Sequence, residues 1–145
     1  MEKLKTPKWG SLGQGRYMLA KNPYAKYANN KINTASGEEL TLMLYDGALK
    51  FCNQAIIALE NNNIEKANNL LIRVQDILQE FQITLDRRFP ISEELFRIYD
   101  FLIARIMEAN LKKDIAIIEE VLGFIRQLRE TWKQAMLLSR KQQST

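Results

Sequence analysis

The sequence contains no histidine, and its single cysteine is Cys52. A Ser-His-Asp triad, a Cys-His dyad, a histidine-ligated zinc site and an internal disulfide therefore cannot be built from this chain. It also lacks an apolar run of about 18 residues, and its polar first ten residues do not resemble a signal peptide. These absences predict a cytoplasmic protein that is not an enzyme, needs no cofactor or metal, and does not insert stably into a membrane.

Proline and glycine are also scarce, and their positions divide the chain. There are three prolines and six glycines, and the stretches 37–85 and 92–139 contain no proline. Because proline breaks helices, these two stretches can form long helical hairpins. We therefore expect a flexible basic tail over residues 1–21, a helical domain over 22–139 that begins with a segment at 22–35, and a disordered C-terminus over 140–145.

Positive charge is concentrated near the N-terminus. Residues 1–36 hold seven basic residues and one acidic residue, whereas the remainder holds 14 basic and 16 acidic residues. A basic tail on a nearly neutral body is usually a solvated tail, so we expect no nucleic-acid partner. The alternative is a helical regulatory protein that binds nucleic acid or another protein through this tail. Steep salt dependence of binding to DNA or RNA would support that alternative.

Apolar residues recur every three or four positions in four segments, which is typical of helices with one buried face. Ser36 and Glu39 form a capping-box pattern at the start of the first segment. The predicted helices cover residues 36–59, 64–85, 92–110 and 114–139. Joined by short connections, they predict an all-α protein, an antiparallel up-down four-helix bundle with a flexible N-terminal segment.

The first helix has a second apolar row beside its core face. This row consists of Leu42, Tyr45, Leu49, Cys52 and Ile56. Either the helix is central in the bundle, or the preceding segment folds over the row, or the row binds an amphipathic helix of a partner. For Cys52, a small buried apolar residue is the preferred interpretation over a nucleophile. Other apolar residues lie off the main stripes of the third and fourth helices, namely Phe96, Ile103, Met107, Ile117 and Phe124.

The segment before the first helix carries Tyr24, Tyr27 and Ile32 on an otherwise polar stretch. These side chains can pack against the bundle in the ordinary way. They can also form a reversible cover over the second apolar row. The pattern does not choose between the two.

Several short motifs occur in one order between about residues 22 and 135. They are NPYAKY at 22–27, NTAS at 33–36, LMLYDGA at 42–48, IYD at 98–100, EAN at 108–110 with Asp114, EV at 120–121 and WK at 132–133. Together these motifs resemble one known family, the flagellin-specific secretion chaperones of the bacterial flagellar export system (the FliS family).

This resemblance implies an export chaperone that binds the disordered C-terminal segment of flagellin in the cytosol. Such a chaperone prevents premature polymerisation and assists delivery to the export gate of the flagellar type III secretion apparatus. The client-binding residues would then be Leu42, Tyr45, Leu49, Ile56, Phe96, Ile103, Met107, Ile117 and Phe124, with Tyr24, Tyr27 and Ile32 as the cover. A further alternative is a cofactor-free enzyme that uses carboxylates such as Asp46 or Asp100.

If residues 22–33 compete with the client, a chain that begins near Asn33 should bind a flagellin C-terminal peptide at least as tightly as the full chain. It should also bind more of an apolar dye, because more apolar surface is exposed. Titration calorimetry and dye fluorescence measure the two effects. Complete loss of peptide binding by a folded truncated chain would instead make the segment part of the binding site.

Overall fold

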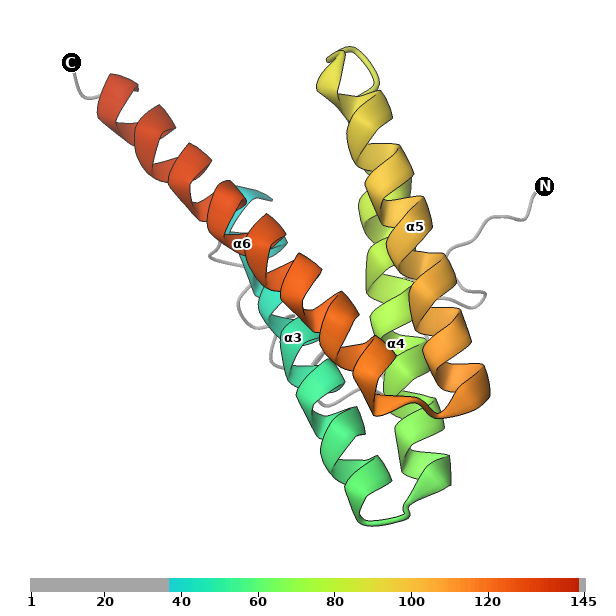
Figure 1. The fold of residues 1–145 in the computed structure, drawn as a ribbon. Helices are drawn as coiled ribbons and strands as arrows, with labels where there is room; N and C mark the ends of the chain where they lie inside the picture. Colours follow the sequence, from blue (N-terminus) through green and yellow to red (C-terminus); the bar gives the residue numbers. More distant parts are fainter. Residues whose placement is uncertain (1–36, 144–145) are drawn as a thin grey trace. The chain divides into compact units, whose positions relative to one another are not determined.

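The computed structural model describes residues 37–143, and all of its regular structure is helical. The four helices are α3 (Gly37–Glu60), α4 (Ile64–Ile83), α5 (Ile91–Lys112) and α6 (Ile115–Gln143). Figure 1 shows that successive helices run in opposite directions. The predicted all-α four-helix fold is therefore confirmed over the described residues.

The chain divides into two compact units, Met1–Met43 and Leu44–Thr145. In the first unit the described residues are 37–43, which form the start of α3. The Thr41 hydroxyl donates a hydrogen bond to the carbonyl of Gly37 over 3.1 Å. The predicted tail at 1–21, the cover residues Tyr24, Tyr27 and Ile32, and the predicted cap Ser36 lie outside the described residues.

Asparagines shape the turn between α3 and α4, which lies where the predicted helix ranges leave a gap. Asn62 adopts the left-handed conformation (φ 59°), which asparagine tolerates better than most residues. The Asn63 side chain accepts a hydrogen bond from the backbone N–H of Lys66 over 3.2 Å and so caps α4. This turn therefore ends one helix and starts the next within three residues.

The turn between α5 and α6 is still shorter, because only Lys113 and Asp114 separate the helices. Lys113 is left-handed (φ 53°), and its N–H donates to the carbonyl of Ala109. The Asp114 carboxylate accepts from the N–H of Ala116 over 2.9 Å, which confirms Asp114 as the residue that starts the last helix.

Three helix ends differ from the prediction by two residues or more. α5 ends at Lys112 rather than at residue 110. α4 ends at Ile83 rather than at residue 85, where Thr84 leaves the helical conformation (φ −93°, ψ 4°) and its hydroxyl bonds back to the carbonyl of Glu80. α6 continues to Gln143, so the predicted disorder is wrong for residues 140–143. No proline or glycine stops this helix, and Arg140 and Lys141 in its last turn interact favourably with the helix dipole.

The core of the second unit is formed by the predicted apolar stripes. α4 packs against α5, and α5 packs against α6. The fully buried large side chains include Leu71, Val74, Ile77 and Leu78 on α4, Leu102 and Ile106 on α5, and Ile118, Val121 and Ile125 on α6. Each contributes roughly 1.5–3 kcal/mol of transfer free energy, so these stripes dominate the stability of the unit.

An aromatic cluster joins α3, α4 and α5. The Phe81 ring lies 4.4 Å from the Tyr45 ring and 5.4 Å from the Tyr99 ring, measured between centroids. The hydroxyls of Tyr45 and Tyr99 share a buried hydrogen bond of 2.7 Å. Burial raises the pKa of both phenols above the usual tyrosine value, so both stay neutral. Each hydroxyl therefore satisfies the other inside the core.

Cys52 is completely buried, and burial raises the pKa of its thiol to about 12. The thiol is consequently protonated at neutral pH and is not a nucleophile. The prediction that Cys52 is a small buried apolar residue is confirmed.

Tyr99→Phe should destabilise the protein by about 1–3 kcal/mol, because it leaves the buried Tyr45 hydroxyl without a partner. The double variant Tyr45→Phe/Tyr99→Phe removes both hydroxyls and should be more stable than the single variant. Urea unfolding of the wild type, of Tyr45→Phe, of Tyr99→Phe and of the double variant measures this. A double variant that loses the sum of the two single losses would contradict the paired arrangement.

Candidate functional site

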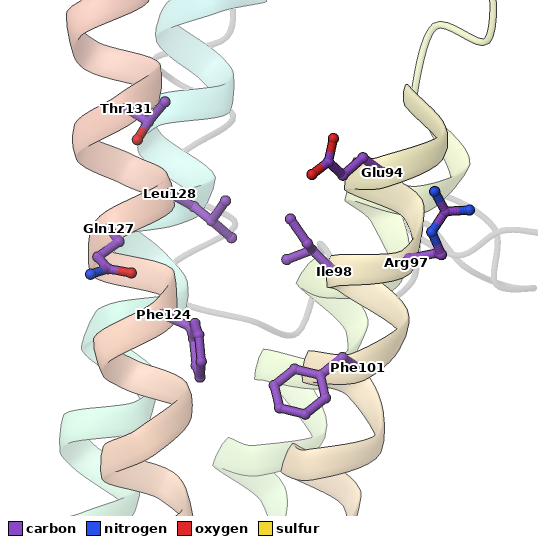
Figure 2. Close-up of a pocket in the computed structure, with 8 residues that line it drawn as sticks. All are labelled: Glu94, Arg97, Ile98, Phe101, Phe124, Gln127, Leu128 and Thr131. Carbon is purple, nitrogen blue, oxygen red and sulfur yellow. The ribbon is translucent and has the colours of Figure 1, made fainter. Parts of the chain in front are cut away.

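A hollow of about 460 Å³ lies between α5 and α6, and we call it the α5–α6 notch. Figure 2 shows it as a cleft between the two helices. It is lined by Glu94, Arg97, Ile98 and Phe101 from α5 and by Phe124, Gln127, Leu128 and Thr131 from α6.

Each helix contributes four lining residues with the same spacing. On both helices they stand at positions i, i+3, i+4 and i+7, which is one face of an α-helix. The notch is thus made of two helix faces that turn toward each other. It spans about two helical turns of each helix, or roughly 10 Å.

The floor of the notch is apolar. Ile98 and Phe101 point from α5 toward α6, and Phe124 and Leu128 point back toward α5 (Figure 2). The rings of Phe101 and Phe124 meet edge to face with centroids 5.6 Å apart. Even so, Phe101 is 46% exposed and Phe124 is 40% exposed. Two large rings therefore keep much of their apolar surface in water, which favours association with a partner.

An ion-pair network joins α5 to α6 between the notch and the α5–α6 turn. Arg105, four residues after Phe101, donates to both carboxylate oxygens of Glu120 over 2.6 and 3.2 Å. Arg105 also bonds to Glu108 over 2.6 Å, and Lys112 bonds to Glu108 over 2.8 Å. The Glu120 hydrogen bonds raise the pKa of Arg105, and the Lys112 hydrogen bond lowers the pKa of Glu108. The network connects α5 to α6 while all its members are ionised.

Among the described residues that line the notch, the ionisable ones are Glu94 and Arg97. The two carboxylates that the sequence offered for catalysis have structural partners instead. Asp46 is paired with Arg129, and Asp100 accepts a hydrogen bond from Gln82 over 3.2 Å. Two apolar helix faces side by side suit an amphipathic helix, which inserts its own apolar face between them.

The structure separates the predicted client residues into three groups. Tyr45, Ile103 and Ile117 are buried in the bundle, which makes them core residues in this conformation. Leu42, Leu49 and Ile56 are half-buried on α3. Phe96, Met107 and Phe124 are exposed.

Among the three exposed residues, only Phe124 lines the notch. Phe96 lies under the guanidinium of Arg87, which is 5.0 Å from the ring centroid. The predicted role of all nine residues in client binding stays a prediction.

Sequence reasoning missed three of the four floor residues. Of the four, the sequence singles out only Phe124, because it lies off the main stripe of its helix. The repeated i, i+3, i+4, i+7 spacing was a signal for the two faces. Spacing alone does not predict that α5 and α6 diverge beyond their connecting turn (Figure 1). This divergence exposes the two faces.

None of the helices within residues 37–143 is both long enough and apolar enough to cross a bilayer.

Phe101→Ser should leave the denaturant midpoint nearly unchanged, because the ring is already half exposed. Leu102→Ala, one residue further and fully buried, should lose about 2–5 kcal/mol of unfolding free energy. Equal losses in the two variants would show that the notch is part of the core.

Comparison with known proteins identifies the family. The profile of the family described as "Flagellar protein FliS" matches residues 20–139. The chain is 43% identical over 124 residues to the flagellar secretion chaperone FliS of Bacillus subtilis, covering 86% of this chain and 93% of that protein. It is 32% identical over 106 residues to FliS of Salmonella typhimurium, covering 71% and 78%. It is 27% identical over 109 residues to FliS of Escherichia coli, covering 73% and 80%. The chain therefore belongs to the FliS family of flagellar secretion chaperones.

Proposed function

We propose that this protein binds the disordered C-terminal segment of flagellin in the bacterial cytosol and holds part of it as a helix in the α5–α6 notch. The half-exposed apolar floor of the notch is the observation that carries this proposal. Membership of the FliS family supports an export role, and the notch supplies a surface on which a client can bind.

The energetics require more than one anchor. Ordering a disordered segment costs about 2–5 kcal/mol or more, and a fully buried apolar side chain contributes roughly 1.5–3 kcal/mol. One side chain in the notch would barely offset the ordering cost. A client helix that fills the notch over two turns can present two or three anchors, and further segments of the client can contact other exposed apolar residues of the chaperone, such as Met107 and Phe96.

Binding of this kind accounts for the rest of the proposed role. A client segment that is folded onto the chaperone is not available to pair with another flagellin, so premature polymerisation is prevented. The complex is then delivered to the export gate of the flagellar type III secretion apparatus. Because the interaction consists of reversible apolar contacts, release at the gate needs no covalent step.

Phe101→Asp should weaken binding of a flagellin C-terminal peptide at least tenfold, because it places a charge in an apolar contact. Phe89→Asp is the matched control, since Phe89 is 57% exposed but does not line the notch. Titration calorimetry measures affinity, and circular dichroism of the mixture should show added helix in the peptide. Wild-type affinity in the Phe101→Asp variant would reject the notch as the client site.

A further inference from the structure

Glu94 gives the rim of the notch a negative charge. Its carboxylate points toward the space between the helices, whereas the guanidinium of Arg97 points away from it (Figure 2). The opposite wall contributes only the neutral side chains of Gln127 and Thr131 to the polar rim. Of the two charged residues that line the notch, Glu94 is therefore the one whose charged group faces an occupant.

Carboxylates on the described surface either have an ion-pair partner or, like Glu93 and Glu94, have none. Asp46, Glu108 and Glu120 each form an ion pair with an arginine or lysine. Among residues 37–143, no basic side chain forms an ion pair with Glu94. A carboxylate beside an apolar cleft favours a positive group on the molecule that fills the cleft.

Helix stability offers a competing reason for an acidic residue at this position. Glu93 and Glu94 both lie in the first turn of α5, where the helix dipole favours negative charge. However, Glu93 does not line the notch. The two residues thus lie in the same helical turn and carry the same charge, but only Glu94 lines the notch.

We propose that Glu94 is a specificity-determining residue, which selects client helices that carry a lysine or arginine at the edge of their apolar face. This inference rests on the proposed function. Along α5, Glu94 precedes Ile98 by four residues and Phe101 by seven, or about 6 and 10 Å. The basic residue of the client should accordingly lie one to two helical turns from the apolar anchor that contacts the two phenylalanines.

A charge-exchange experiment tests this with the full-length chain. The probe is a synthetic peptide of the flagellin C-terminal segment from the same organism, together with versions in which each lysine or arginine in turn is changed to glutamate. Glu94→Lys should weaken binding of the unchanged peptide about fivefold, the upper range for a solvent-accessible ion pair. Glu93→Lys, which makes the same change in net charge, should alter affinity less than twofold. One of the peptides with a glutamate in place of a lysine or arginine should bind the wild-type protein weakly. The same peptide should bind the Glu94→Lys variant with restored affinity.

Three results would overturn the inference. Equal weakening by Glu93→Lys and Glu94→Lys would indicate a general charge effect. If Glu94→Lys restores the affinity of none of the glutamate peptides, no basic residue of the client contacts this carboxylate. A change in oligomeric state of Glu94→Lys, seen by size-exclusion chromatography, would show that a second copy of the chain occupies the notch. Thermal unfolding of both variants checks that the fold is kept.

The experiment also separates this inference from the proposed function. If the unchanged peptide binds wild type and binding depends on Phe101 but not on the charge at residue 94, the function stands and the specificity role is wrong. If the peptide does not bind wild type, both fail.

Discussion

The geometry of the notch depends on one constraint, the two-residue connection between α5 and α6. Lys113 and Asp114 bring the ends of the helices together, and the Arg105–Glu120 ion pair holds them side by side for the next turns. Beyond this pair the helices diverge, and the apolar residues on their facing sides are left partly in water. A longer connection between α5 and α6 would not hold the two helices together at this end.

The same constraint separates buried from exposed apolar residues on α5. Leu102 and Ile106 face the core and are fully buried, whereas Phe101 is about half exposed although it is adjacent in sequence. A chaperone needs this separation, because it must be stable without its client and still offer apolar surface. Such a surface also attracts other apolar segments. In the proposed role, the acidic residue Glu94 at the rim restricts which segments bind.

Much of the fold could be predicted from the sequence because it depends on local chemistry and periodicity. The asparagine turn before α4, the Asp114 cap and the stripe from Leu70 to Phe81 are all visible in sequence spacing. The notch could not be predicted, because it depends on how two helices diverge in space. For the same reason the sequence placed Tyr45 in a second apolar row without deciding whether the row is buried, since its hydroxyl partner Tyr99 is 54 residues away in the chain.

The most direct test of the account is to map the client on the chaperone by amide chemical shifts, titrating the full-length protein with a flagellin C-terminal peptide. The account predicts that the largest changes occur at residues 94–101 and 124–131, on the two sides of the notch. Unchanged resonances at these residues, with the largest changes around Ile72 on the outer face of α4, would contradict it.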